Sequence, residues 1–228
     1  MDGHRLLARN ELPLDTVLLA CQLIGKILVR ETPEGSVSGR VVETEAYPVG
    51  DAAGHAYRGM TPRNRSLFLC RGHAYVYVAY GKFCMLNVVS EIAGVGAGIL
   101  IRALEPMDGI PIMQRNRGAQ SLRHLTRGPG RLTVALEIDR RLDGTDLCRK
   151  GPLRLACDDQ NQWEIGRSAR IGLSREVEHL LRFYIRGNRF VSGPNTLLDE
   201  TDDRFQRYLA VGARADEGQE STRSGNPN

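Results

Sequence analysis

The segment 73–87 constrains the fold of this chain more than any other. Its residues alternate in the manner of a β-strand, turn near Lys82 and alternate again. A turn centred on Lys82 puts Tyr77 opposite Asn87 on the same face, where the Cβ atoms of paired residues lie about 5 Å apart. The segment therefore predicts a β-hairpin that sets an aromatic ring beside an amide and carries Tyr80 at its tip.

Two interpretations of the hairpin tyrosines are open. Tyrosine is a good strand former, and cross-strand tyrosine pairs ordinarily stabilise a sheet. Flat side chains in a basic protein also stack on nucleic-acid bases, and a residue on a protruding tip can wedge between base steps. Sheet packing explains the strand tyrosines better when they are taken alone, whereas the tip position of Tyr80 favours contact with bases.

Composition sets the size and class of the protein. The 228 residues are 41% hydrophobic and 25% charged, as in soluble globular proteins, and suffice for one substantial domain or two small ones. The net charge of +4 says little about a polyanionic partner, but arginines cluster in segments 58–71 and 115–131. Local basic faces of this kind bind phosphates. A solvated arginine-rich surface explains the clusters equally well.

Cysteine usage and hydropathy indicate the compartment. The five cysteines include no CxxC pair, which argues against a disulfide framework or a zinc site. The chain begins without a signal peptide, and no apolar run approaches membrane-spanning length. We expect a reduced intracellular protein without a membrane partner, in the cytoplasm or nucleoid of a prokaryote or the nucleus of a eukaryote.

The remaining patterns predict one α+β domain over residues 1–213, followed by a disordered polar tail over residues 214–228. Capping residues, prolines in the first turn and apolar periodicity indicate where helices and strands begin and end. Helices are expected at 15–25, 105–117 and 129–137, and strands at 26–31, 39–47, 99–104, 166–173 and 181–186.

Two glutamates interrupt the apolar strand at 39–47. The period of two puts Glu43 and Glu45 on one face with Tyr47, and a partly buried carboxylate needs a partner or a function. One function is that of a general base, which orients and deprotonates a water molecule. The alternative, slightly favoured by the strand alone, is a pair of surface glutamates on an edge strand.

Arg102 lies in another apolar strand, where its charge is costly unless paired. Glu43 or Glu45 is the expected partner. Together with Tyr47 and the loop residue His55, this pair could surround one cavity. A salt bridge that only ties two strands together is the alternative for Arg102, and a lone loop histidine is more often solvated.

Several reaction classes fit the chain poorly. It contains no P-loop, HExxH motif, zinc-type Cys/His spacing or Gly-x-Ser-x-Gly nucleophile elbow. No lysine stands in an apolar run suited to Schiff-base chemistry. We therefore expect neither a metal nor a cofactor.

Six segments together resemble the alkyladenine, or 3-methyladenine, DNA glycosylases of the mammalian-type superfamily. Each is a weak signal alone, but they occur in that family's order, span nearly the whole predicted domain and are highly specific in combination. The segments are VVETEAY (41–47), TPRNR (61–65), YVYVAYG (75–81), FCMLN (83–87), IRALEP (101–106) and LRFYIRG (181–187).

The resemblance implies a single mixed α+β domain, with a curved antiparallel sheet flanked by helices and a protruding β-hairpin that inserts into DNA. It implies a monomer that binds duplex DNA containing damaged purines and extrudes one nucleotide. The enzyme then hydrolyses the N-glycosidic bond with a glutamate-activated water and leaves an abasic site. The damaged base can be alkylated, deaminated or an etheno adduct.

The resemblance also assigns roles to residues. Glu45 matches the water-activating base, and Arg102 matches the arginine that helps to hold the water. The residues that match the pocket around the flipped base are Tyr47, His55, Tyr77 and Asn87, with Asn87 as the amide that disfavours the amino group of guanine. The matches to DNA contacts are Tyr80, which fills the gap in the duplex, and Lys82, Arg63 and Arg65.

Two alternatives stay open. Lys82 occupies a tip position that holds an apolar residue in the family, so it can wedge between bases or contact a phosphate. The second concerns function, because a non-catalytic module could recognise flipped or single-stranded bases with the same tyrosines. Glu45 discriminates between the two functions, since a binding module has no need of a carboxylate beside a polyanion.

Overall fold

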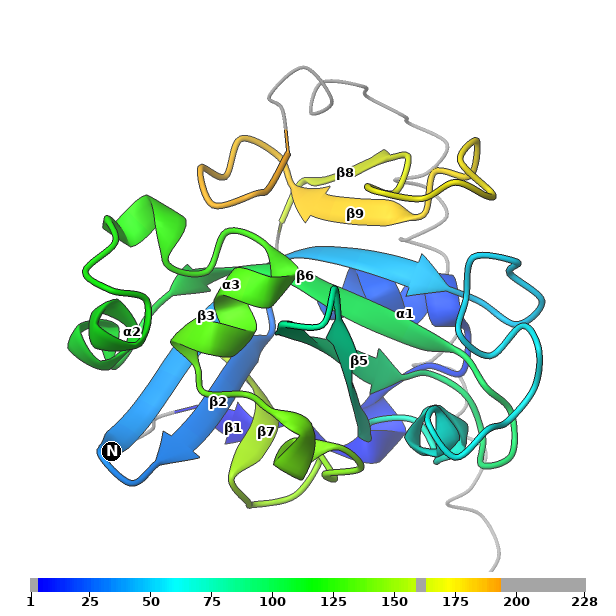
Figure 1. Cartoon of the computed structure of the whole chain (residues 1–228), viewed down its shortest axis with the longest axis horizontal. Helices are drawn as coiled ribbons and strands as arrows, with labels where there is room; N and C mark the ends of the chain where they lie inside the picture. Colours follow the sequence, from blue (N-terminus) through cyan, green and yellow to red (C-terminus); the bar gives the residue numbers. More distant parts are fainter. Residues whose placement is uncertain (1–3, 159–162, 194–228) are drawn as a thin grey trace, which may run out of the picture.

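A curled antiparallel sheet forms the centre of the computed structural model, which describes residues 4–158 and 163–193 (Figure 1). The main path of the sheet is β1-β7-β2-β3-β6-β5-β4; in addition, β9 pairs with β3 and β8 pairs with β9. The prediction of one α+β domain with a curved antiparallel sheet is confirmed. The strands are β1 (Arg5–Leu6), β2 (Ile27–Thr32), β3 (Gly35–Tyr47), β4 (Ala74–Ala79), β5 (Phe83–Val89), β6 (Gly98–Pro106), β7 (Leu153–Cys157), β8 (Ile165–Ser168) and β9 (Arg182–Ile185).

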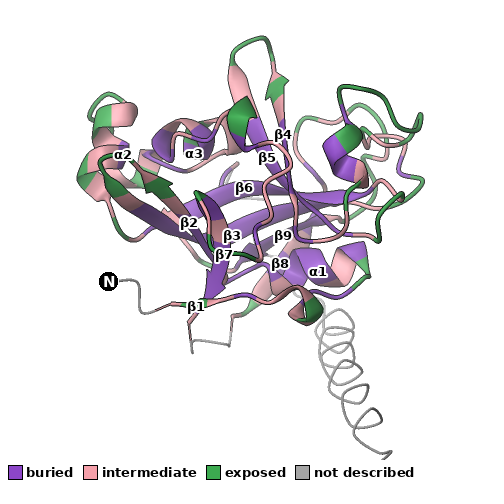
Figure 2. Cartoon of the chain, turned by 90° about the horizontal axis from the view of Figure 1, so that it is seen from below, coloured by how far each residue is buried: buried purple, intermediate pink, exposed green. Residues whose placement is uncertain are grey.

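Short helices flank the sheet. In Figure 2, α1 and α3 lie on opposite sides of the central strands. Asp15 caps α1 as expected, because its side chain accepts a hydrogen bond of 2.7 Å from the Leu18 N–H. The α-helices are α1 (Thr16–Gln22), α2 (Ile110–Asn116) and α3 (Pro129–Ala135), and the 3-10 turns are Arg9–Glu11, Arg65–Phe68, Leu122–His124 and Arg140–Leu142.

β3 is the central strand of the sheet. It pairs with β2 in its first half, with β9 at Glu43–Glu45, and with β6 along most of its length. Val41, Val42 and Ala46 have no exposed surface. The expectation of surface glutamates on an edge strand is therefore wrong, because β9 covers the very part of β3 that carries them.

The hairpin of β4 and β5 has a different register from the one expected. Tyr75, not Tyr77, lies opposite Asn87, and Ala79 pairs with Phe83, so the turn is centred on Gly81. Tyr80 and Gly81 both have left-handed backbones (φ 52° and 65°), and the Lys82 N–H donates to the Ala79 carbonyl at 3.1 Å. This turn geometry matches the twist of paired strands. Tyr77 stays on the face of Tyr75 and Asn87, two residue pairs nearer the tip, where it lies opposite Met85.

Other boundaries also differ from expectation. β6 runs on to Pro106 because Glu105 and Pro106 pair with Arg40 and Gly39 of β3, so the helix expected over 105–117 begins only at Ile110. The strand expected over 166–173 ends at Ser168. β1 and β7 were not predicted. The expected domain end at 213 and the polar tail lie outside the described residues. In the part of the chain that is described, no helix is both long and apolar enough to cross a membrane.

Candidate active site

Arg102 of β6 bridges the two glutamates of β3. Its Nε donates to Glu43 Oε1 at 3.0 Å, and its Nη1 lies 3.1 Å from Glu45 Oε1. Both carboxylates are fully buried, and Arg102 is nearly so. Burial opposes the charged guanidinium, but the two carboxylates outweigh it and raise the pKa of Arg102. Both partners that the sequence offered for Arg102 are therefore used.

Glu43 is the anchor of a second, wholly buried network. Oε1 accepts from Arg182 Nε at 2.7 Å and from the Ser192 hydroxyl at 2.9 Å, and Oε2 accepts from the Ser192 N–H at 2.6 Å. Burial alone would raise the pKa of Glu43, but Arg182, Arg102 and the Ser192 N–H together lower it. Glu43 thereby joins β3 to Arg182 of β9 and to Ser192.

Glu45 is held differently. Oε1 accepts from the Ile171 N–H at 2.7 Å, and Oε2 accepts from the Tyr47 hydroxyl at 2.9 Å. Burial and the neighbouring Glu45 charge raise the pKa of Tyr47, so its hydroxyl stays protonated and acts as the donor. The groups that touch Glu45 line two openings: Tyr47 lines a small pocket, whereas Arg102 and Ile171 line a wider cleft.

The small pocket has a volume of about 130 Å³ and is lined by every residue that the family resemblance assigned to the base pocket. The His55 and Tyr77 rings meet at a centroid distance of 4.4 Å and an angle of 64°, and Tyr77 stacks on Tyr75 at 5.4 Å. His55 Nδ1 lies 3.0 Å from the Tyr75 hydroxyl. The buried Asn87 amide donates to the Tyr75 carbonyl at 3.3 Å. The four predicted residues, which are Tyr47, His55, Tyr77 and Asn87, thus share one pocket.

His55 is exposed, but its imidazole makes edge-on contacts with both Tyr75 and Tyr77. Desolvation and the charge of Arg63 lower the pKa of His55. The imidazole is therefore neutral at physiological pH, with one nitrogen able to donate a hydrogen bond and the other able to accept one.

Sequence reasoning missed three residues that shape the pocket. Asn64 connects two parts of the loop between β3 and β4. Its Oδ1 accepts a hydrogen bond from the Thr61 N–H at 2.6 Å, and its Nδ2 donates one to the His55 carbonyl at 2.8 Å. Arg170 lies behind Tyr47 and pairs with Asp51. Asn64 belongs to a segment that carried the family resemblance, whereas no local pattern singled out Arg170 or Asp51.

The candidate DNA contacts lie around the hairpin. Tyr80 is 88% exposed at the tip, and the exposed Lys82 holds its Nζ 5.6 Å from the Phe83 ring centroid. Arg63 Nη2 donates to the Val78 carbonyl at 3.3 Å, and the exposed Arg65 begins a 3-10 turn in the same loop. Beside the hairpin, the cleft of about 770 Å³ is lined by Tyr80 and by arginines of the second cluster, namely Arg117, Arg127 and Arg131.

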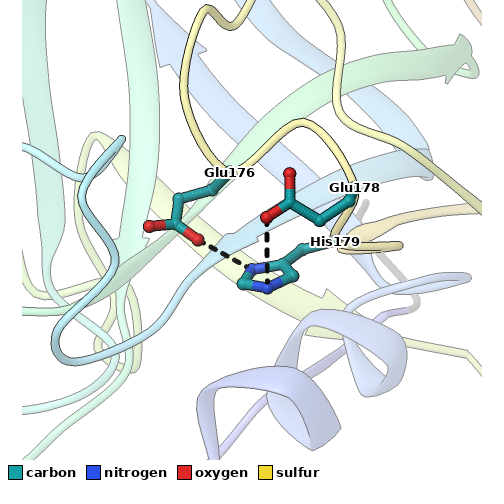
Figure 3. A group of neighbouring side chains, drawn as sticks. All are labelled: Glu176, Glu178 and His179. Carbon is teal, nitrogen blue, oxygen red and sulfur yellow. Dashed lines mark ion pairs between the residues drawn. The ribbon is translucent and has the colours of Figure 1, made fainter.

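Figure 3 shows one group of side chains of the metal-binding type, Glu176, Glu178 and His179. No other group of three is found among residues 4–158 and 163–193. It lies in the loop between β8 and β9, and Glu178 and His179 are exposed. His179 Nδ1 lies 3.2 Å from Glu176, and Nε2 lies 3.9 Å from Glu178. Surface ion pairs explain this geometry, and none of the three residues lines the pocket or the cleft.

Comparisons with known proteins show the family of the chain. A sequence model of the family described as "Methylpurine-DNA glycosylase (MPG)" matches residues 10–189. Three similar proteins carry the name "Putative 3-methyladenine DNA glycosylase". The protein from Mesorhizobium japonicum is 67% identical over 196 residues, which cover 86% of this chain and 94% of the relative. The proteins from Paraburkholderia phytofirmans and Methanoculleus marisnigri are 51% and 46% identical and cover 84% and 78% of this chain, and 90% and 94% of their own lengths.

These matches span most of the chain and place the protein in the class of DNA glycosylases, which are hydrolases of the N-glycosidic bond. Within that class, the chain belongs to the methylpurine-DNA glycosylase family.

Proposed function

We propose that this DNA glycosylase flips damaged purines out of duplex DNA and hydrolyses their N-glycosidic bond with a water activated by Glu45. The observation that carries the proposal is the position of Glu45. This carboxylate is fully buried, forms an ion pair with Arg102, and accepts a hydrogen bond from Tyr47, which lines the aromatic pocket. Family membership supports the reaction class, and the names of the relatives support 3-methyladenine as one substrate.

The arrangement suggests how the reaction proceeds. Arg102, Ile171 and Tyr47 fix the orientation of the Glu45 carboxylate. Glu45 accepts a proton from water as the water oxygen bonds to C1′ of the sugar, while the base departs with the electrons of the glycosidic bond. A purine alkylated at N3 or N7 is already cationic and leaves as a neutral molecule. Hypoxanthine and ethenoadenine are neutral and need a proton or hydrogen bonds as they depart.

The pocket and the hairpin supply recognition in this proposal. An extruded base stacks on the tyrosine rings of the pocket, with Asn87 placed to collide with the amino group at C2 of guanine. Tyr80 enters the gap that the flipped nucleotide leaves, and Lys82, Arg63 and Arg65 contact the DNA around it. The exposure of Tyr80 at a hairpin tip supports this role.

A two-stage assay tests the proposal. The protein is incubated with duplex DNA that carries one 3-methyladenine or one ethenoadenine, and half of each sample is then heated in alkali. If the protein releases the base without cutting the strand, breaks should appear only in the half heated in alkali. Glu45→Gln preserves the size of the side chain but removes the base, so this variant should bind the damaged duplex and lose excision. Strand breaks before alkali, or a wild-type single-turnover rate in Glu45→Gln, would contradict the proposed mechanism.

A further inference from the structure

Arg170 and Asp51 form a buried ion pair directly against Tyr47. Their side chains are 0% and 2% exposed. The Arg170 guanidinium contacts Asp51 through both terminal nitrogens, with Nη2 3.2 Å from Oδ1, and Nη1 also donates to the Ala46 carbonyl at 2.9 Å. The guanidinium carbon lies 4.6 Å from the centroid of the Tyr47 ring. A cation therefore occupies one face of this ring.

The pair lies at the edge of the aromatic pocket, with its two members placed differently. Tyr47 and Asp51 line the pocket, whereas Arg170 does not. The guanidinium lies over one face of the Tyr47 ring without itself lining the pocket. A base that stacks on the other face of Tyr47 would have the tyrosine ring between itself and Arg170.

The charge of Arg170 has a consequence for such a base. The face of an aromatic ring attracts cations, but a cation on one face weakens the attraction for a second cation on the other. Without compensation, Arg170 would also repel a cationic base about 8 Å away by enough to weaken its binding about tenfold or more. The bidentate contact with Asp51 places a negative charge beside Arg170 and cancels most of this repulsion.

We propose that the Asp51–Arg170 pair determines the charge selectivity of the base pocket, with Asp51 compensating Arg170 so that a cationic alkylated purine can stack on Tyr47. The inference rests on the proposed function and adds to it a pair of specificity-determining residues. Neither residue is assigned a part in the chemical step.

A purely structural role is the competing explanation. Asp51 Oδ1 also accepts from the Ala53 N–H at 2.8 Å, and the Asp51 carbonyl accepts from the Gly54 N–H at 2.9 Å, so the pair helps to shape the loop that carries His55. Damage to this loop should slow the excision of cationic and neutral bases alike. A compensation of charge should instead change the ratio of the two rates.

The experiment compares single-turnover release of 3-methyladenine, which is cationic in DNA, with release of the neutral hypoxanthine. Asp51→Asn leaves Arg170 uncompensated and should lower the ratio of cationic to neutral release about tenfold. Arg170→Gln leaves Asp51 without its cation and should raise the ratio. The double variant Asp51→Asn/Arg170→Gln carries neither charge, and its ratio should return close to the wild-type ratio.

Several controls separate charge from folding. Melting temperatures are measured for each variant, and if either single variant does not fold, the other and the double variant still give the ratio. Asp143→Asn removes a carboxylate that holds the Val76 N–H and the Ser66 hydroxyl, and it should leave the ratio unchanged. If wild-type protein does not release hypoxanthine, its affinity for the hypoxanthine duplex replaces that rate.

The signs of the two shifts decide the result. Opposite shifts in the single variants, with recovery in the double variant, support the inference. Equal losses on both substrates, or shifts of the same sign, would overturn it while leaving the proposed function intact. A wild-type protein that releases neither base would contradict the proposed function itself, and the inference with it.

Discussion

Glu43 and Glu45 are two positions apart in one strand, yet their surroundings differ and the proposed function gives them different tasks. Glu43 receives hydrogen bonds from Arg102, Arg182 and Ser192, none of which lines the aromatic pocket. Glu45 accepts hydrogen bonds from the Tyr47 hydroxyl, which lines that pocket, and from the Ile171 N–H. Their separate tasks follow from which groups other strands and loops bring to each carboxylate.

Glu43→Gln should therefore act mainly on stability. The change leaves Arg182 and Arg102 without one buried counter-charge, and breaking such a pair costs about 3–5 kcal/mol. For a chain of this size, we expect the melting temperature to fall by about 10 °C. Excision per folded molecule should stay closer to wild type than in Glu45→Gln. A variant that melts like wild type but excises nothing would show that Glu43 belongs to the reaction.

The lowered pKa of Glu43 also predicts an acid dependence of stability. A carboxyl whose folded pKa lies below its unfolded value of about 4.5 adds stability above that pH, and the contribution is lost as pH falls through the folded pKa. The free energy of unfolding of the wild-type protein should thus decline below about pH 4.5. Denaturant titrations should show a shallower decline for Glu43→Gln, and parallel curves would contradict this assignment.

Asn87→Ser should relax discrimination against guanine. Asn87 lines the pocket with Tyr77, and the proposed function has its amide collide with the C2 amino group of a guanine stacked there. A shorter side chain removes the clash and should allow excision of guanine lesions, or slow excision of normal guanine. Ratios of single-turnover rates on matched duplexes measure the effect. An unchanged ratio would place the selectivity in His55 or in the chemistry of the leaving group.

Sequence reasoning reached the Arg102 pair because a charge in an apolar strand demands a partner. It could not reach Arg182 and Ser192 as partners of Glu43, or Arg170 as the partner of Asp51. Those contacts join positions more than a hundred residues apart, and no local periodicity records them. Only the tertiary fold brings such groups together.

At the scale of elements, the hairpin shows what a local pattern can and cannot specify. Alternation predicted the two strands and the shared face of Tyr77 and Asn87. The register depended on one glycine, because Tyr80 and Gly81 adopt left-handed conformations and move the centre of the turn from Lys82 to Gly81. The prediction that a helix begins at residue 105 was wrong for a different reason. Residues 105 and 106 pair with β3, and this strand pairing overrode the helical pattern.

Tyr80→Ala should weaken nucleotide flipping. Extrusion leaves a hole in the base stack, and unstacking costs a few kcal/mol, part of which a residue in the hole offsets. The loss of excision should be large in duplex DNA and small in single strands, where no stack needs filling. Val78→Ala is the matched control, because it trims a partly exposed side chain of the same hairpin. Equal losses on both substrates would mean that Tyr80 only supports the hairpin.

At the scale of the whole molecule, excision should not depend on a divalent metal ion. The proposed step uses a carboxylate, a water molecule and stacking, and none of Glu176, Glu178 and His179 lines the pocket or the cleft. Activity should persist in excess EDTA at wild-type rate. Loss of activity that a divalent cation restores would favour a metal-dependent mechanism.

The central place of β3 has a consequence for how the molecule opens. Its amide hydrogens lie in ladders with β2, β6 and β9, so they should exchange with solvent deuterium only when the whole domain unfolds. Amides at the hairpin tip should exchange through small local fluctuations and become labelled far sooner. Mass spectrometry after timed deuterium labelling would distinguish the slow exchange of the β3 amides from the fast exchange of the hairpin-tip amides. The strand that holds the carboxylate proposed to activate water would then keep its structure until the whole domain unfolds, while the hairpin tip proposed to contact DNA would open more often.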